Sequence, residues 1–344
     1  MRFSLPLFAL AAVLFTGCTK SSQTQSAAPQ VATKPGANIK VGLVLDKGGK
    51  DDKSFNSGAF RGASEGVEQF GVQLKDVESA DDAAFEPALR TFGERGYNLV
   101  IAVGFAQTDA VKKVAPQFPK THFAIVDGRV DAPNVASLMF AEHEGSYLVG
   151  YLAGLLSKTG KVGFIGGMDI PLIRRFETAY AAGAKAANPK VKVEVNYVGV
   201  NSSAWANPVR GKELALSQYS RGVDVIFHGA GASGLGIFDA AEEKNGFVIG
   251  VDSNQNALKP GRVVTSMLKR VDAAVLATIK EEVEGKYQPG LHSFGLKDKG
   301  IDYAVDSNNE KVIGPFLAKL EEIKQKILSG EIKVPDFYEM NKAK

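Results

Sequence analysis

The sequence predicts an α/β protein made of two lobes, each a parallel sheet flanked by helices. From residue 39 onward, short runs rich in Val, Ile and Leu alternate with helical segments, a pattern typical of parallel strands that are covered on both faces. The alternation begins again near residue 160. A chain of 344 residues is long enough for two lobes with cores of their own.

The first lobe accounts for the alternation up to residue 127. Its predicted strands are 39–45, 72–79, 99–104 and 122–127, and its predicted helices are 54–70, 82–94 and 107–117. Ser54 stands where the first helix begins. We expect it to be the N-cap, because a serine hydroxyl there can accept a hydrogen bond from the backbone.

The second lobe repeats the spacing of the first. Three strand segments correspond: 40–49 with 160–167, 100–105 with 225–231, and 124–127 with 248–252. The separation is 121 residues from Val41 to Val162 and 125 residues from Asp127 to Asp252. This near-constant offset favours two similar lobes over chance similarity between buried strands. An apolar helix over 142–158 is expected to pack in the second lobe, and an amphipathic helix lies within 309–332.

The N-terminal segment is predicted to be a targeting signal and not part of the fold. Residues 1–17 hold an apolar run that is shorter than the roughly 20 residues needed to span a bilayer and is typical of a signal peptide. Small residues before Cys18 resemble a lipobox, which predicts lipidation there; a plain secretory signal with a chance cysteine is the alternative. The polar segment 18–38 is predicted to be a flexible tether.

Composition excludes several classes of function. The 41 basic and 38 acidic residues nearly balance, which argues against a nucleic-acid binder with a concentrated basic surface. Cys18 is the single cysteine, so the chain has no intramolecular disulfide and no cysteine-based zinc site. The four histidines are scattered and none has metal-ligand spacing, so we expect neither a metal nor a cofactor.

Three aspartates close buried strands, namely Asp46, Asp127 and Asp252. Ligands of open α/β sheets bind at the carboxyl ends of the strands, so two facing lobes predict a cleft that these residues share. A carboxylate accepts strong hydrogen bonds and can hold vicinal hydroxyls or a ring N–H. Taken singly, each aspartate has a plain alternative as the cap of the next turn.

Three further side chains are candidates for the same cleft. Phe55 lies in the first turn of a helix beside a strand end, and Trp205 is the single tryptophan, in the polar stretch NSSAWANP. Either aromatic can stack on a flat ligand; a core phenylalanine and a loop anchor are the alternatives. Lys269 follows the strand 262–268 and can pair with Asp252 and donate to a hydroxyl, with a solvated lysine as the alternative.

Catalytic motifs find little support. The aspartates have no histidine partner, and GASGLG at 231–236 does not fit the GxSxG nucleophile elbow because Leu235 occupies the second glycine position. GAGASG at 229–234 does not complete GxGxxG. We therefore predict tight turns beside a ligand, and no enzymatic activity.

Several of these segments together resemble the basic membrane protein family of bacterial lipoproteins, whose best-understood members are purine nucleoside receptors of ABC transporters. The segments are KVGLVLDKGGKDDKSFN, EGSYLVGYLAG, KVGFIGGMDIPLIRRFETAYAAG, VIFHGAG and VIGVDSNQ. The resemblance covers about residues 39–335. It implies a periplasmic-binding-protein fold of the type with three interlobe crossovers. One lobe would then comprise 39–142 with about 270–310, and the other 143–269 with about 311–335.

The resemblance also implies a binding site. Phe55 and Trp205 match the two aromatics that sandwich the purine, and Asp46 matches the carboxylate at the edge of the base. The group around the ribose is matched by Asp127, Asp252, Lys269 and Gly231.

The implied function is an extracytoplasmic, lipid-anchored binding protein that delivers a purine nucleoside to an ABC permease. We expect a monomer with no cofactor and no nucleic-acid partner. Two alternatives stay open: a receptor for another polyhydroxylated solute, such as a sugar or an autoinducer, and a sensor lipoprotein that contacts other proteins.

Overall fold

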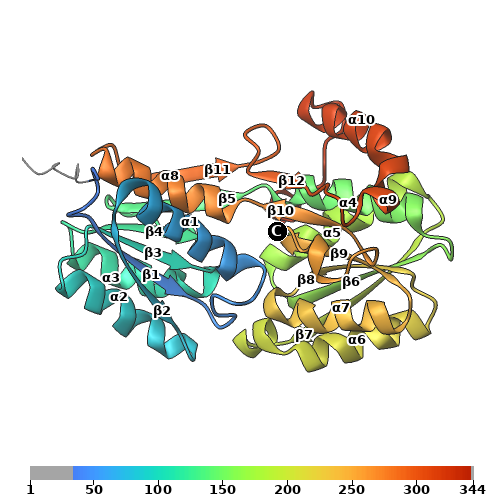
Figure 1. The fold of residues 1–344 in the computed structure, drawn as a ribbon, viewed down its shortest axis with the longest axis horizontal. Coiled ribbons are helices and arrows are strands. Elements are labelled where there is room, and N and C mark those ends of the chain that lie inside the picture. The colour runs from blue at the N-terminus through green and yellow to red at the C-terminus, as the bar shows by residue number, and fades with distance from the viewer. Residues whose placement is uncertain (1–33, 342–344) are drawn as a thin grey trace, which may run out of the picture. The chain divides into compact units, whose positions relative to one another are not determined.

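The computed structural model describes residues 34–341, so the signal peptide predicted over 1–17, lipidation at Cys18 and the first part of the predicted tether lie outside the described residues. Two six-stranded sheets form the body (Figure 1). The first contains β1 (Lys40–Leu45), β2 (Gln73–Glu78), β3 (Leu99–Val103), β4 (His122–Val126), β5 (Val135–Phe140) and β11 (Gly290–Phe294). The second contains β6 (Lys161–Met168), β7 (Lys192–Gly199), β8 (Val225–Gly229), β9 (Phe247–Asp252), β10 (Val263–Lys269) and β12 (Ile301–Tyr303).

The strand orders of the two sheets correspond, which confirms the predicted fold class. They are β11-β5-β4-β3-β1-β2 and β12-β10-β9-β8-β6-β7. Pairing is parallel throughout these strands except between β10 and β12, which are antiparallel. The chain passes from one sheet to the other three times: after β5, after β10, and between β11 and β12.

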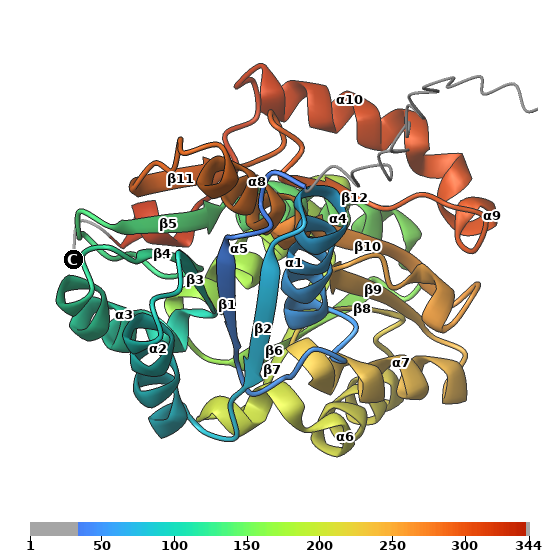
Figure 2. The ribbon, with the colours of Figure 1, turned by 60° about the vertical axis from the view of Figure 1, so that its left-hand side comes forward.

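Helices cover both faces of each sheet because the strands are apolar on both sides. In the first lobe α1 (Phe55–Phe70) packs with α8 (Val271–Val283), and α2 (Phe85–Glu94) with α3 (Thr108–Val114) on the opposite face (Figure 2). The second lobe has the corresponding pairs α4 (Glu142–Leu156) with α5 (Pro171–Ala187), and α6 (Pro208–Ser220) with α7 (Gly234–Glu243). As expected, the apolar helix α4 packs in the second lobe, where the C-terminal α10 (Leu317–Leu328) contacts it.

Two expected boundaries differ from the structure. The strand β12 lies inside the segment 270–310 assigned to the first lobe, yet its antiparallel pairing with β10 makes it the edge of the second sheet. In addition, residues 34–38 of the predicted tether form a turn on the folded body. The Gly36 N–H donates to the Phe70 carbonyl, and the Gln73 side chain donates to the Ala37 carbonyl, both at 2.8 Å.

The start of α1 also differs from the expectation. Ser54 occupies the N-cap position, but its hydroxyl makes no capping bond and instead donates to Asp252 of the second lobe at 2.6 Å. The Asp52 carboxylate takes over the capping role, because it accepts the N–H groups of Ser54, Asn56 and Ser57 at 2.8 to 3.0 Å. The displaced serine therefore links the two lobes.

No helix within residues 34–341 combines the length and the hydropathy that a membrane span requires.

The packing of α4 against α5 in the second lobe depends on glycine. A Cβ atom on Gly183 of α5 would lie 2.1 Å from the Tyr147 carbonyl oxygen, and one on Gly150 of α4 would lie 2.2 Å from the Tyr180 carbonyl oxygen. These backbones can only approach so closely without side chains at the two positions.

Replacing Gly183 with Ala is expected to destabilise the protein by about 1–3 kcal/mol, because the added methyl group overpacks a contact with rigid backbone. Urea unfolding measures the change. G314A is the matched control, since a Cβ at Gly314 would meet nothing within 4 Å. Equal midpoints for both variants would contradict the packing argument.

Candidate functional site

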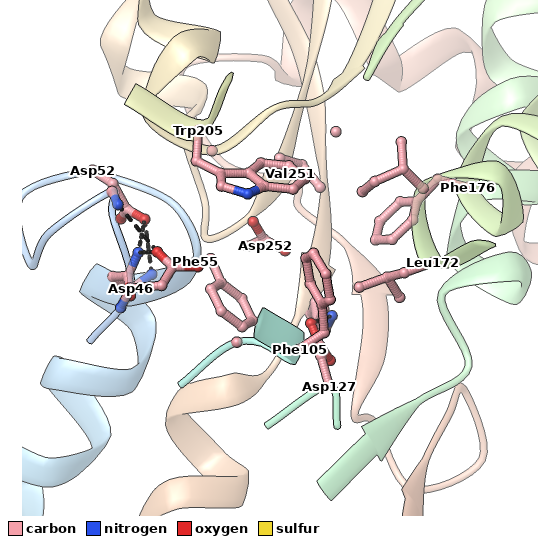
Figure 3. Close-up of a pocket in the computed structure, with 17 residues that line it drawn as sticks. Asp46, Asp52, Phe55, Phe105, Asp127, Leu172, Phe176, Trp205, Val251 and Asp252 are labelled. Atoms are coloured by element: carbon pink, nitrogen blue, oxygen red, sulfur yellow. Dashed lines mark hydrogen bonds and ion pairs between the residues drawn. The ribbon is translucent and has the colours of Figure 1, made fainter. Parts of the chain in front are cut away.

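A pocket with about 550 Å³ of space, part of it open to solvent, lies between the two lobes. All seven ligand-binding residues expected from the sequence line it: Asp46, Phe55, Asp127, Trp205, Gly231, Asp252 and Lys269. Figure 3 shows how side chains from both lobes point into this shared space.

The strand ends position the polar side chains of the pocket. Asp46 follows β1, Asp127 follows β4, and Asp252 and Lys269 are the last residues of β9 and β10. Asp127 and Asp252 both adopt left-handed backbone conformations, with φ of 63° and 65°. Aspartate, asparagine and glycine tolerate this region best. The two lobes therefore use the same turn to direct a carboxylate into the pocket.

Aromatic side chains form the apolar walls of the pocket. Phe55 opens α1, and Trp205 lies on the short 3₁₀ segment Ser202–Ala206. The indole lies directly on Gly167 of β6, where a Cβ atom would come within 2.1 Å of the ring. Phe105 meets Trp205 edge-on, with ring centroids 6.3 Å apart (Figure 3). On another side Leu172, Ile173 and Phe176 of α5 complete the apolar surface.

Asp46 is fixed by Asn56 of α1. The Asn56 side-chain amide donates to Oδ1 of Asp46 at 2.7 Å and accepts the Asp46 N–H at 3.1 Å. The Gly48 N–H also donates to Oδ1 at 3.1 Å, so both of these bonds reach the same carboxylate oxygen. Burial raises the pKa of Asp46 to about 6, against the opposing effect of the bond from Asn56.

Asp252 is held across the lobe interface. Its Oδ2 accepts the Ser54 hydroxyl at 2.6 Å, and the neighbouring Ser253 hydroxyl donates to the Ser54 carbonyl at 2.8 Å. Burial raises the pKa of Asp252 to about 7, although the charge of Lys269 and the bond from Ser54 oppose the rise. This carboxyl therefore titrates close to neutral pH.

Lys269 does not pair with Asp252, contrary to the expectation. Its Nζ lies 2.5 Å from Oδ2 of Asp127 and 2.9 Å from Oε1 of Glu142. These two carboxylates are its ion-pair partners at the lobe interface. Burial raises the pKa of Asp127 to about 6, with Lys269 opposing the rise and Glu142 adding to it. The other oxygen of Asp127, Oδ1, is buried and has no hydrogen-bond partner among the described residues.

Some lining residues escaped the sequence analysis. Phe105 follows Gly104 at the carboxyl end of β3, so the rule that located the aspartates would also have found it. Asn56 lies one residue after Phe55, and its role depends on the turn that brings it back to Asp46. Phe176 and Leu172 lie on the buried face of α5, where nothing in the sequence separates pocket residues from core residues.

The arrangement suits a flat, uncharged ligand with hydrogen-bond donors along its edges. The aromatic rings offer apolar faces, and four carboxyl groups, those of Asp46, Asp52, Asp127 and Asp252, line the same pocket with the single cation Lys269. Carboxylates accept hydrogen bonds and do not donate them. The ligand must therefore supply the donors.

Comparison with known proteins places the chain in a family. Residues 39–337 match the Bmp family, described as ABC transporter substrate-binding protein PnrA-like. The CD4+ T-cell-stimulating antigen of Listeria innocua is 37% identical over 97% of both chains. The ABC transporter nucleoside-binding protein BmpA of Lactococcus lactis is 33% identical over 95% of this chain and 96% of its own.

Solved structures agree with this assignment. An ABC transporter solute-binding protein from Aeropyrum pernix superposes with a TM-score of 0.79 at 32% identity, covering 86% of this chain and 94% of its own. The two proteins therefore share one fold over most of their length. The chain therefore belongs to the Bmp family of PnrA-like ABC transporter substrate-binding proteins.

Proposed function

We propose that the protein is an extracytoplasmic lipoprotein, anchored through Cys18, that binds a purine nucleoside in the interlobe pocket and delivers it to an ABC permease. One observation carries the proposal: aromatic walls and carboxyl groups from three strand ends line a single pocket. The relative from Lactococcus lactis named as a nucleoside-binding protein supports the same ligand class.

The aromatic walls fit the face of a heterocyclic base. Phe55 comes from the first lobe and Trp205 from the second, so a ring bound between them would contact both lobes. Stacking of a base on an aromatic side chain contributes roughly 1–3 kcal/mol. A ligand that stacks on both residues therefore favours, by this extra contact, the arrangement in which both lobes lie against it.

The carboxyl groups fit the donors of a nucleoside. Oδ1 of Asp127 is a buried acceptor without a partner among the described residues, and a ribose hydroxyl would satisfy it. Asp46 lies at a different part of the pocket, near Phe55 (Figure 3), where a ring N–H would meet its carboxylate. A ligand that lacks these donors leaves buried acceptors unpaired, which costs about 1–3 kcal/mol for each group.

Isothermal titration calorimetry of the purified protein tests the proposal. Inosine, guanosine and adenosine are titrated beside ribose, arabinose and the free bases. We expect heat from purine nucleosides and much weaker binding of sugars and bases, since neither reaches both the aromatic walls and the carboxylates. Tight binding of a sugar without a base would favour the alternative receptor, and release of free base from inosine would reveal a hydrolase.

Replacing Phe55 with Ala is expected to weaken nucleoside binding about 10- to 100-fold, the range of one lost stacking contact. The matched control is F60A, which removes a phenylalanine from the same helix but outside the pocket. Calorimetry of both variants separates a loss of stacking from a loss of helix packing. Unchanged affinity in F55A would show that the base binds elsewhere.

A further inference from the structure

A chain of ion pairs runs from the ligand pocket to the C-terminal segment. Lys269 bridges Asp127 and Glu142, at 2.5 and 2.9 Å. Oε2 of Glu142 lies 2.6 Å from Arg175, and Arg175 binds Asp336 through two parallel contacts of 2.9 and 2.8 Å. Two of these five groups, Asp127 and Lys269, line the pocket.

The five groups come from five different parts of the fold. Asp127 follows β4 of the first lobe, Arg175 lies on α5 of the second, and Asp336 precedes the short helix α11 (Phe337–Met340). Glu142 begins α4, directly after the first passage between the sheets, and Lys269 ends β10, directly before the second. The cluster therefore lies where the chain crosses between the lobes.

Burial makes the cluster depend on its own charges. Glu142 is fully buried, and Lys269 is only 3% exposed. Burial alone would raise the pKa of Glu142, but Lys269 and Arg175 outweigh it and hold the pKa of this carboxyl below its usual value. Burial would likewise lower the pKa of Lys269, but Asp127 and Glu142 hold it above its ordinary value. Both residues are thus charged at neutral pH.

The ammonium group of Lys269 contacts two parts of the pocket, the carboxylate of Asp127 and the aromatic wall. It occupies Oδ2 of Asp127 and leaves Oδ1 without a partner among the described residues. It also lies 5.2 Å from the ring centroid of Phe55 and 5.8 Å from that of Phe176, a distance at which a cation attracts an aromatic face. Whatever fixes Lys269 therefore fixes both an acceptor and a stacking wall.

Glu142 and Arg175 supply that fixation. Glu142 is the second carboxylate that contacts Lys269. Arg175 donates a hydrogen bond to Glu142 and another to the Phe140 carbonyl, which fixes its own position beside Glu142. The Tyr338 ring lies on the guanidinium, with the Arg175 Cζ atom 4.9 Å from its centroid, so the C-terminal segment closes the outer side. Neither Glu142 nor Arg175 lines the pocket.

We infer that Glu142 and Arg175 are positioning residues for ligand binding, which hold Lys269 against Asp127 and so aim the free oxygen of Asp127 at the ligand. The inference rests on the proposed function, because it assigns a ligand donor to that oxygen. It predicts that two residues outside the pocket control both the affinity and its dependence on pH.

Asp127 is surrounded by charged and titratable groups on several elements. They are Lys269, Glu142 and Arg175 in the cluster, Asp46 and Asp252 in the pocket, and Tyr338 on the C-terminal side. The charge of Glu142 raises the pKa of Asp127 and the charge of Arg175 lowers it. Removing either charge should therefore move the titration of Asp127, in opposite directions.

The test is titration of inosine into the wild-type protein, E142Q and R175Q across the acid range. Both variants are expected to bind inosine about 10- to 100-fold more weakly at neutral pH, as for the loss of one hydrogen bond to a charged group. The midpoint of the acid step in affinity that Asp127 sets, near its pKa of about 6, should move down in E142Q and up in R175Q. A purely structural role would lower the melting temperature but leave this midpoint in place.

R174Q is the matched control, because Arg174 is the next residue on α5 but pairs with Asp169 and Glu177 outside the cluster. It is expected to keep wild-type affinity and midpoint. R175K covers the case that the neutral variants fail to fold. It keeps the charge without the two-pronged contact, so affinity should fall while the midpoint stays.

Three results would decide against the inference or its basis. Wild-type affinity and midpoint in E142Q would overturn the positioning role alone. Wild-type affinity in R175K, when E142Q and R175Q do not fold, would overturn it as well. No heat from inosine with the wild-type protein would instead overturn the proposed function, and the positioning role with it.

Discussion

Replacing Asp252 with Asn is expected to stabilise the ligand-free protein by about 4 kcal/mol at alkaline pH, and to weaken nucleoside binding about 10- to 100-fold. Burial raises the pKa of this carboxyl from 3.8 to about 7, and each pKa unit corresponds to about 1.4 kcal/mol. Asparagine keeps the shape of the side chain and also tolerates the left-handed backbone, with φ of 65°. The substitution therefore removes the buried charge without backbone strain.

The stability gained in D252N should depend on pH in a way that identifies the Asp252 carboxyl as its source. Above its ordinary pKa of 3.8 the unfolded chain releases the Asp252 proton, whereas the folded chain keeps it up to about pH 7. The folded state binds more protons between these limits, so wild-type stability falls as the pH rises through this window. The variant lacks this contribution, and its advantage should grow from near zero at the acid limit to its full size above neutral pH.

Thermal unfolding of the ligand-free protein at several pH values measures the effect. For a chain of this size we expect D252N to melt about 5–10 °C above the wild type at alkaline pH. D131N is the matched control, because Asp131 is exposed and lies outside the pocket. Equal melting temperatures for D252N and the wild type would show that the buried carboxyl does not destabilise the ligand-free state.

Nucleoside affinity of the wild-type protein is expected to fall at least about 100-fold from its plateau when the pH is lowered two units below the pKa of Asp252. A protonated carboxyl is a weaker acceptor for a ligand hydroxyl, and each pH unit below the pKa reduces the ionised fraction about tenfold. Asp252 titrates at about 7, and Asp46 and Asp127 at about 6. Loss of affinity should therefore begin near neutral pH and steepen below pH 6.

Calorimetry in two buffers of different ionisation enthalpy also reports the protons released on binding. We expect proton release near neutral pH, because the ligand's donors favour the ionised carboxylates. D252N should lose the first part of the pH dependence and keep the part below pH 6. Affinity that stays constant across the acid range would mean that the ligand does not bind to these carboxylates.

The sequence was informative where position along a strand decides the outcome. Asp46, Asp127 and Asp252 could be found because parallel strands place their carboxyl ends at one edge, whatever the packing of the rest. The same reasoning anticipated two similar lobes from the offset between Val41 and Val162. It located candidates for the pocket, and their ligand roles stay predictions.

Ion pairs and hydrogen bonds between the lobes could not be predicted from the sequence in the same way. Lys269 pairs with Asp127 and Glu142 because three elements distant in sequence meet at the crossing points. Ser54 is a residue type that often caps helices and stands at the cap position. Asp52 nevertheless caps the helix, which leaves the Ser54 hydroxyl free to bond to Asp252. Local propensity predicted the element correctly, and tertiary contact decided what its first side chain does.

The first lobe takes α8 and β11 from residues 271–294, more than a hundred residues after its other strands. During synthesis the other strands of the first lobe emerge from the ribosome before β6 to β10 of the second lobe, and α8 and β11 follow only after these. Until then the outer edge of β5 is unpaired and the face of α1 that later meets α8 is bare, which makes the nascent chain prone to aggregate. Neither lobe can therefore be expressed as one contiguous fragment. A chaperone that binds the nascent chain would cover the unpaired edge of β5.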